Sequence, residues 1–427
     1  MDKIFNETVE TISEIIKFNS EQTPPEKDMP FGKGNRDCLH YFLSLASSFG
    51  FETVNYDNYA GEVIFGEGKD FAVLAHLDVV PAGSGWTKEP FGGEIDYNKK
   101  RIYGRGTMDD KGPAVILLYC LKALKDEGFK PKRRIRLIVG CNEESGWKCI
   151  EHFNSCSVMP EEGFSPDADF PVIYAEKGIL QLKFFFPAAG LKIKGGDRGN
   201  MVCGLCQAET EKNRDKLNEI IKRYPDRNIS FADGKLTVKG KSAHGSTPEA
   251  GVNAILPVLD YLGLEKEKNL LFEDGFEIAD FEDVTGRLTF SPNVVSSDNK
   301  GVYVTCDLRF PATYTSEKVL EAIRKQNVEF EITHYQPPLY NDKECRLIRV
   351  LCDTYNEVTG KNVKPIAIGG GTYARALKCG AGFGPEEEGE ENVIHQPDEY
   401  ITFEKIEKCL KIYKLALERL TSTDSDI

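Results

Sequence analysis

Short apolar runs alternate with stretches of helical periodicity in the first part of the chain. This alternation constrains the fold more than any other feature. The runs 71–75, 134–140 and 170–175 are short and apolar enough for buried strands. Residues 3–18 and 112–127 carry apolar side chains at the spacing of one helix face. Strands that alternate with helices predict an α/β fold, with a central sheet flanked by helices.

The alternation of buried strands with helices stops near residue 187 and resumes near residue 342. The part in between alternates strands and helices in a way that indicates an inserted α+β domain. We therefore expect a first domain formed by residues 1–186 and 342–427, interrupted by a second domain over 187–341. The expected elements of the later parts are strands 235–240 and 301–309 and helices 209–223, 315–325, 343–358 and 403–420.

Charge and hydropathy exclude several classes of partner. The formal net charge is -14, and an acidic chain is not broadly attracted to nucleic acid or to an anionic membrane. The N-terminus lacks the basic start and apolar core of a signal peptide. No apolar run approaches the ~18 residues that span a membrane. We therefore expect a cytoplasmic protein with reduced cysteines, which binds neither nucleic acid nor membrane.

Histidines and carboxylates fall where the expected strands run out into loops. His76 and Asp78 follow the run 71–75, and residues two apart in a strand share a face. The carboxyl ends of strands are also where open α/β sheets place their sites. The other members of the set are Asp109 in a Gly-rich loop, Glu143 and Glu144 after the strand 134–140, then Asp167 and His395.

This set of side chains suits a pair of divalent metal ions. The short carboxylate of Asp109 can bridge two ions, and Asp78 is placed to hold the second ring nitrogen of His76. One of the adjacent Glu143 and Glu144 can bind metal while the other faces a nucleophilic water. Mixed imidazole and carboxylate ligands suit zinc, and manganese or cobalt can take its place. Taken alone, each motif is also typical of a strand end or a solvent-exposed loop without a function.

The other histidines and the CxxC motif give a weaker signal. His40, His152 and His334 have no acidic loop motif around them, and we interpret them as surface or structural residues. Cys203 and Cys206 form a lone CxxC without a second CxxC or a close histidine. A redox or zinc role for this pair stays open.

As an ordered set, the motifs resemble the co-catalytic zinc peptidase family of carboxypeptidase G, aminoacylase and dipeptidases. The resemblance covers essentially the whole chain and is strongest to the bacterial Xaa-His dipeptidase (PepV-type, carnosinase-like) branch. The segments that carry the family pattern are 75–81, 104–113 and 142–146, and those that resemble the branch are 29–32, 164–171, 200–202 and 369–373.

The resemblance implies two Zn²⁺ ions, with Mn²⁺ or Co²⁺ as substitutes, and a glutamate general base. Glu143 would be the base. Asp78 would support catalysis by holding His76, which is a ligand of one ion. The metal ligands would be His76 and Asp167 for one ion, Glu144 and His395 for the other, and Asp109 as the bridge.

The resemblance also implies that the inserted domain is a lid that binds substrate. His244 would stabilise the oxyanion, and Asn200 and Arg309 would contact substrate. The chain departs from the dipeptidase pattern in a shorter lid and in Cys203, where the pattern has proline. The carboxylate of the substrate would be held by Gly370, Gly371 and Thr372.

The expected function is a di-zinc metallopeptidase that hydrolyses dipeptides by a metal-bound hydroxide, with Glu143 as general base. One alternative is an N-acyl-amino-acid deacylase, which does not recognise a free substrate amine. Asp110, Glu176 and Asp78 are open candidates for that recognition. A second alternative is a non-catalytic metal-binding or peptide-binding protein, which would have no use for a general base. We expect a small dipeptide as partner and favour a monomer over a homodimer.

Overall fold

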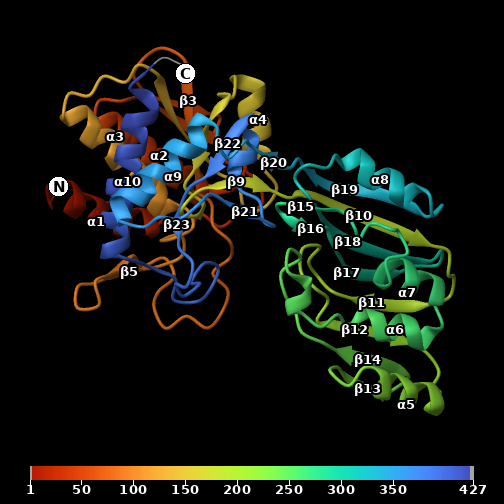
Figure 1. Ribbon diagram of the computed structural model, residues 1–427. Helices are drawn as coiled ribbons and strands as arrows, with labels where there is room; N and C mark the ends of the chain where they lie inside the picture. The colour runs from red at the N-terminus through yellow and green to blue at the C-terminus, as the bar shows by residue number, and fades with distance from the viewer. Residues whose placement is uncertain (1, 424–427) are drawn as a thin grey trace. The chain divides into compact units, whose positions relative to one another are not determined.

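The structure, a computed structural model, describes residues 2–423, which form two compact units (Figure 1). The expected fold class is confirmed: one unit is α/β and the other carries an antiparallel sheet with helices. Unit 1 comprises the chain up to Tyr174, residues 341–366 and the chain from Thr372 onward, and unit 2 comprises 175–340 and 367–371.

Unit 1 contains most of a nine-stranded sheet, of which residues 175–176, 339–340 and 367–368 are counted in unit 2. Its strands are β1 (Glu52–Tyr56), β2 (Ala60–Phe65), β3 (Asp70–His76), β6 (Arg134–Gly140), β7 (Glu162–Ser165), β9 (Ile173–Glu176), β20 (Leu339–Tyr340), β21 (Ile366–Ile368) and β22 (Cys379–Gly382). The strand order is β1-β2-β6-β3-β7-β22-β9-β20, with β21 paired to β9. Strands β6, β3, β7 and β22 are parallel to one another, whereas β1, β2 and β20 pair antiparallel to their neighbours.

Helices and short sheets complete unit 1. The helices are α1 (Asp2–Ile16), α2 (Lys33–Ser48), α3 (Lys111–Asp126), α4 (Lys148–Cys156), α9 (Arg346–Thr359), α10 (Phe403–Thr421) and the 3₁₀ turn η2 (Tyr373–Ala376). The short strands are β4 (Glu94–Asp96), β5 (Arg101–Tyr103), β8 (Ala168–Asp169), β23 (Pro385–Glu386) and β24 (Tyr400–Thr402).

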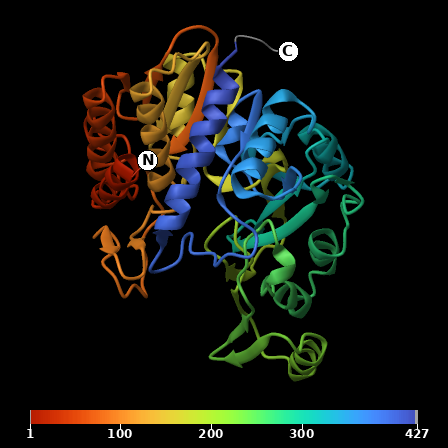
Figure 2. The same ribbon diagram turned by 60° about the vertical axis from the view of Figure 1, so that its left-hand side comes forward.

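Helix α3 is the central helix of this unit. Pro113 fits its first turn because a proline there lacks only an N–H that the helix leaves unpaired. Gly128, with φ 77°, lies just past its end, where a left-handed residue stops a helix. The helix packs against α10 and α1 as well as β3 (Figure 2). It is therefore apolar on nearly every face, which explains its long buried run.

The register of the parallel strands brings their carboxyl ends together. His76, the last residue of β3, pairs with Gly140, the last residue of β6. The chain that leaves β6 reaches Glu143 three residues later, and the chain that leaves β7 reaches Asp167 two residues later. Loops from three neighbouring strands therefore start from one edge of the sheet.

Unit 2 is built on an eight-stranded antiparallel sheet of order β13-β14-β12-β11-β17-β18-β10-β19. Its strands are β10 (Gly178–Phe186), β11 (Lys192–Gly195), β12 (Leu205–Glu209), β13 (Asn228–Ala232), β14 (Lys235–Lys239), β17 (Thr289–Ser297), β18 (Val302–Phe310) and β19 (Glu329–Gln336), besides the small pair β15 (Glu282–Asp283) and β16 (Gly286–Arg287). Its helices are α5 (Arg214–Arg223), α6 (Ile255–Leu262), α7 (Glu265–Phe272), α8 (Ser316–Arg324) and the 3₁₀ turn η1 (Pro248–Ala250).

The two units have separate apolar cores. The core of unit 2 forms between its sheet and helices such as α6 and α7. Strand β10 belongs to this sheet because it pairs with β18 and β19, so unit 2 begins before residue 187. The domain boundaries expected at 187 and 342 stay predictions, as does the lid role of the inserted domain. Within residues 2–423, no helix has the length and apolar character needed to cross a bilayer.

Phe164 tests how firmly β7 is held in the sheet of unit 1. Its side chain is fully buried and its ring lies 6.2 Å from Phe71, 5.6 Å from Phe383 and 6.0 Å from Tyr413, between ring centroids. Phe164→Ala should lower the free energy of unfolding by about 3–5 kcal/mol because it leaves a cavity. Urea denaturation followed by circular dichroism measures this loss. Val158→Ala, at a side chain that is 80% exposed, is the control, and equal stability of the two variants would contradict the packing described.

Candidate metal centre

The five expected metal ligands lie together at the carboxyl edge of the parallel strands in unit 1. His76 ends β3, and Asp109 lies in the loop that leads into α3. Glu144 lies between β6 and α4, and Asp167 follows β7. His395 lies in the loop before β24, with φ 62° in the left-handed region. Segments far apart in the sequence thus contribute one side chain each.

Two triads of donor atoms share Asp109. In the first, His76 Nε2 lies 2.9 Å from Asp109 Oδ1 and 3.7 Å from Asp167 Oδ2. In the second, His395 Nε2 lies 2.9 Å from Asp109 Oδ2 and 3.1 Å from Glu144 Oε1. Within each triad the donor atoms lie within 4.8 Å of one another. Because Asp109 turns one oxygen toward each imidazole, its carboxylate is suited to bridge two cations.

The two triads differ in their exposure to solvent. The side chain of His76 is fully buried and that of Asp109 is 8% exposed. His395, in contrast, is 46% exposed. A site of three protein ligands that is open on one side leaves a coordination position for water or substrate, as catalytic metal sites do. The exposed edge of the centre therefore lies at His395.

The electrostatics of the cluster favour cations. Burial, followed by the charge of Asp109, raises the pKa of Glu144 to about 7. The same two causes raise the pKa of Asp167. Burial lowers the pKa of His395, but hydrogen bonds to Asp109 and Glu144 outweigh it and raise that pKa to about 11. The crowded carboxylates thus draw protons to themselves and to the imidazoles, and divalent ions would supply the missing positive charge.

Asp78 holds both His76 and the glutamate loop. The Nδ1 atom of His76 lies 2.9 Å from the main-chain oxygen of Asp78 and 3.6 Å from its carboxylate, so the main chain is the nearer partner. A carbonyl only accepts, so Nδ1 donates and Nε2 is left to bind a metal. The carboxylate of Asp78 accepts hydrogen bonds from the N–H groups of Glu143 (2.9 Å) and Glu144 (3.2 Å).

Glu143 lies beside the triads without belonging to either of them. Its Oε1 atom accepts a hydrogen bond of 3.1 Å from Trp147 Nε1. Burial, with the nearby carboxylates of Asp167 and Glu144, raises the pKa of Glu143 well above its usual range. The ring of Trp147 in turn packs edge-on against Tyr373 at 5.0 Å between centroids. The carboxyl group of Glu143 is therefore fixed in position by its neighbours.

Glu399 is a supporting residue that the sequence analysis missed. It is fully buried, and its Oε1 atom accepts hydrogen bonds from the N–H groups of Gly106 (3.1 Å) and Met108 (2.9 Å). Its Oε2 atom accepts a bond of 2.6 Å from Arg105 Nη1. This carboxylate therefore fixes the loop that presents Asp109. No motif surrounds Glu399; its only signal in the sequence is its place four residues after His395.

Asp110 and Glu176 are two of the three candidates for binding a substrate amine. Both are fully buried. The Oδ2 atom of Asp110 accepts a hydrogen bond of 3.0 Å from the main-chain N–H of His76, and the peptide bond that joins Asp110 to Asp109 is cis. Glu176 belongs to unit 2. The geometry thus gives Asp110 a role in holding the end of β3.

The expected substrate residues of unit 2 gather around Gly245. The N–H of Gly245 donates to the main-chain oxygen of Asn200 at 2.7 Å, directly after His244. A Cβ placed on Gly245 would lie 3.1 Å from the carboxyl carbon of Asp307. That carboxylate accepts a hydrogen bond of 2.7 Å from Arg309 Nε. The structure therefore brings the segments of Asn200, His244 and Arg309 together within this unit.

The Gly-rich loop joins unit 2 to unit 1. Gly370 and Gly371 belong to unit 2, and Thr372 begins the last part of unit 1. A Cβ on the preceding Gly369 would lie 3.9 Å from the main-chain oxygen of Ser246, two residues beyond His244. The hydroxyl of Thr372 accepts a hydrogen bond of 3.1 Å from the N–H of Ala374, at the start of η2.

The fold and the paired triads are those of a metallohydrolase, and comparison with known proteins gives the family. The model of Peptidase family M20/M25/M40 matches residues 72–419, so the chain belongs to this family. The resemblance drawn from the motifs is thereby confirmed.

Named relatives align with nearly the whole chain. A Bacillus subtilis (strain 168) protein named "Putative dipeptidase YtjP" is 34% identical over an alignment 445 positions long, which covers 95% of this chain and 96% of the relative. A Staphylococcus epidermidis (strain ATCC 12228 / FDA PCI 1200) protein named "Putative dipeptidase" is 32% identical over an alignment 462 positions long, which covers 98% of each chain.

Solved structures show the same fold at lower identity. The dipeptidase Dug1p of Saccharomyces cerevisiae matches with a TM-score of 0.62 and 15% identity, over 99% of this chain and 98% of that one. Human carnosine dipeptidase 1 matches with a TM-score of 0.58 and 13% identity, over 99% and 98% of the two chains.

Glu399 provides a test of how the centre is supported. Glu399→Gln keeps the size of the side chain but places an amide NH₂ among donors that need an acceptor. Mutation of a residue that holds the metal ligands in place typically lowers metal affinity roughly 10- to 100-fold. We therefore expect Glu399→Gln to lose zinc affinity in this range. Competition with a chromogenic chelator measures it. Glu404→Gln, at an exposed position of α10, is the control. Equal affinity of the two variants would show that Glu399 does not support the centre.

Proposed function

We propose that the protein is a metal-dependent dipeptidase whose centre is formed by the two triads that share Asp109. This proposal rests on the different positions of the two adjacent glutamates. Glu144 lies within a triad, whereas Glu143 lies beside it with its carboxyl group held by Trp147. Membership of the peptidase family and the dipeptidase names of full-length relatives support the reaction and the substrate class.

The proposed ligands form two sets. His76 and Asp167 would hold one ion and Glu144 and His395 the other, with Asp109 as the bridge. Three carboxylates and two neutral imidazoles fit two Zn²⁺ ions in number and donor type, with Mn²⁺ or Co²⁺ as substitutes. When bound, a pair of divalent ions lowers the pKa of water and polarises the scissile carbonyl.

Glu143 is the proposed general base. Its Oε1 atom is engaged by Trp147, so Oε2 is the atom that takes a proton from the attacking water. As the oxygen of that water bonds to the carbonyl carbon, the proton passes through Glu143 to the leaving nitrogen, and the C–N bond breaks. Asp78 assists by holding the main chain of Glu143 and Glu144 through both carboxylate oxygens.

Substrate recognition is assigned to the inserted domain and the Gly-rich loop. We assign oxyanion stabilisation to His244 and substrate contacts to Asn200 and Arg309. The backbone N–H groups of Gly370 and Gly371, with the hydroxyl of Thr372, would hold the C-terminal carboxylate, because glycine lets a backbone approach a ligand closely. These roles stay predictions, as do the cytoplasmic location and the monomeric state.

A dipeptide turnover assay separates this proposal from its two alternatives. A dipeptidase cleaves unmodified dipeptides. An N-acyl-amino-acid deacylase uses the same ions and base but prefers substrates whose amine is acylated. A non-catalytic binding protein turns over neither class. The zinc-loaded full-length protein should therefore be assayed on unmodified dipeptides and on their N-acetylated forms, and turnover of the acetylated forms alone would select the deacylase.

Glu143→Gln tests the proposed base. The change keeps size and removes proton transfer, which is worth roughly 10²–10⁴-fold in rate. We expect kcat to fall by this factor while elemental analysis still finds the metal content of the wild type. Glu151→Gln, at an exposed position of α4, is the matched control and should keep full kcat. Near-normal turnover by Glu143→Gln would show that the two glutamates are assigned to the wrong roles.

The end groups of the substrate test the proposed carboxylate anchor. If Gly370 and Gly371 hold the C-terminal carboxylate, the substrate must end in a free carboxylate close to its scissile bond. We therefore expect cleavage of unmodified dipeptides, a sharp loss on C-terminal amidation, and weak or no cleavage of tripeptides. Steady-state kcat/KM on a matched series of one sequence measures these differences. Efficient cleavage of amidated or long peptides would contradict the anchor.

A further inference from the structure

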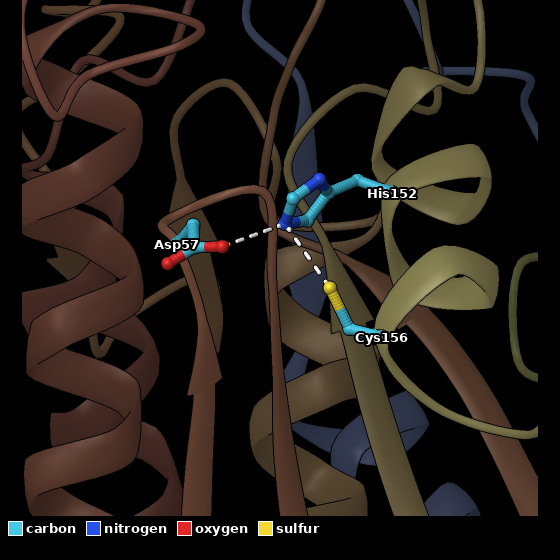
Figure 3. Close-up of side chains that lie close together, drawn as sticks. All are labelled: Asp57, His152 and Cys156. Atoms are coloured by element: carbon cyan, nitrogen blue, oxygen red, sulfur yellow. Dashed lines mark hydrogen bonds and ion pairs between the residues drawn. The ribbon is translucent and has the colours of Figure 1, made fainter.

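A second cluster of metal-binding side chains lies outside the centre described above. It consists of Asp57, in the turn between β1 and β2, and of His152 and Cys156 on α4 (Figure 3). His152 and Cys156 are four residues apart on one helix, so both point to the same side. Asp57 is 95 residues from His152 in the sequence, and only the fold brings the three together.

The donor atoms of this cluster face one another. His152 Nε2 lies 3.0 Å from Asp57 Oδ2 and 3.6 Å from Cys156 Sγ (Figure 3). A tetrahedral zinc ion with bonds of about 2.1 Å to nitrogen and about 2.3 Å to sulfur places those two atoms about 3.6 Å apart. The same ion places nitrogen and oxygen ligands about 3.4 Å apart. The side chain of Asp57 is 77% exposed and is free of packing that would prevent this small adjustment.

Neighbouring residues fix the imidazole and the turn. The ring of His152 stacks on that of Tyr59 with centroids 4.1 Å apart and an angle of 20°. The main-chain oxygen of Tyr59 accepts a hydrogen bond of 3.1 Å from the N–H of Cys141. Asn58, the residue after Asp57, donates from its side chain to the main-chain oxygen of Asp28 at 2.9 Å. The cluster is therefore partly preorganised.

We propose that Asp57, His152 and Cys156 form an accessory binding site for a zinc-like divalent cation, separate from the centre that contains Asp109. A neutral imidazole, a thiolate and a carboxylate supply two negative charges, which balance one divalent ion. The thiol of Cys156 releases its proton to solvent when the sulfur–metal bond forms. Three protein ligands leave a fourth position for water.

The position of the cluster on α4 also favours a cation. Cys156 is the last residue of this helix, and its last turn carries no basic residue. The carbonyl end of a helix has a partial negative charge that attracts cations. The imidazole and thiolate select borderline and soft ions, so Mg²⁺ and Ca²⁺, which prefer oxygen ligands, would not occupy the site. A bound ion would tie the end of α4 to the turn between β1 and β2.

Cobalt is the probe that distinguishes this site from the central one. A cobalt–thiolate bond absorbs in the near ultraviolet by charge transfer, and the ligands proposed for the central site contain no sulfur. Full-length protein titrated with Co²⁺ should develop this band, and Zn²⁺ should displace it. Cys156→Ser and His152→Gln should lose the band, and elemental analysis should find less zinc in Cys156→Ser than in the wild type after identical dialysis.

Other thiols provide the controls. Cys345→Ser, at a partly exposed thiol, and the double change Cys203→Ser with Cys206→Ser should keep the band. Absence of the band in the wild type, or its survival in Cys156→Ser, would overturn the proposal. Unchanged far-ultraviolet circular dichroism in Cys156→Ser shows that the loss of the band reports the ligand and not unfolding.

Discussion

The carboxylate of Asp109 is the group on which the candidate centre depends, because it faces two imidazoles at once. Its oxygens lie 2.9 Å from His76 Nε2 and 2.9 Å from His395 Nε2. Hydrogen bonds from those imidazoles outweigh burial and lower the pKa of Asp109. The same charge contributes to the raised pKa of Glu144. Buried carboxylates as close together as those of Asp109 and Glu144 repel one another, so they are stable only when cations or protons lie beside them.

The surrounding structure holds Asp109 and its neighbours by buried carboxylates that do not themselves belong to a triad. Glu399 accepts N–H groups of the Asp109 loop, and Asp78 accepts those of the glutamate loop. Asp110 accepts the N–H at the end of β3. Each of these contacts uses a carboxylate oxygen to fix the backbone beside a candidate ligand.

The sequence predicted the sheet flanked by helices, and it marked the candidate ligands at strand ends, because both features leave local signals. Strand 134–140 agrees with β6, and helix 403–420 is α10 within one residue. The strand expected at 170–175 begins only at Ile173, since Pro171 has no N–H to donate to a strand ladder. Contacts between distant segments, such as that of Asp57 with His152, have no local signal. The sequence predicts a surface or structural role for His152 because no acidic loop motif surrounds it, and only the fold places it beside Asp57 and Cys156.

Removal of metal tests the central account most directly. The protein should be dialysed against a strong chelator, its metal content verified by elemental analysis, and its melting temperature and dipeptide turnover measured on the same preparation. We expect turnover to be abolished and the melting temperature to fall together, because an ion that binds only the folded state stabilises it by mass action. Zn²⁺, Mn²⁺ or Co²⁺ should restore both. Full turnover by a preparation shown to be free of metal would contradict the account.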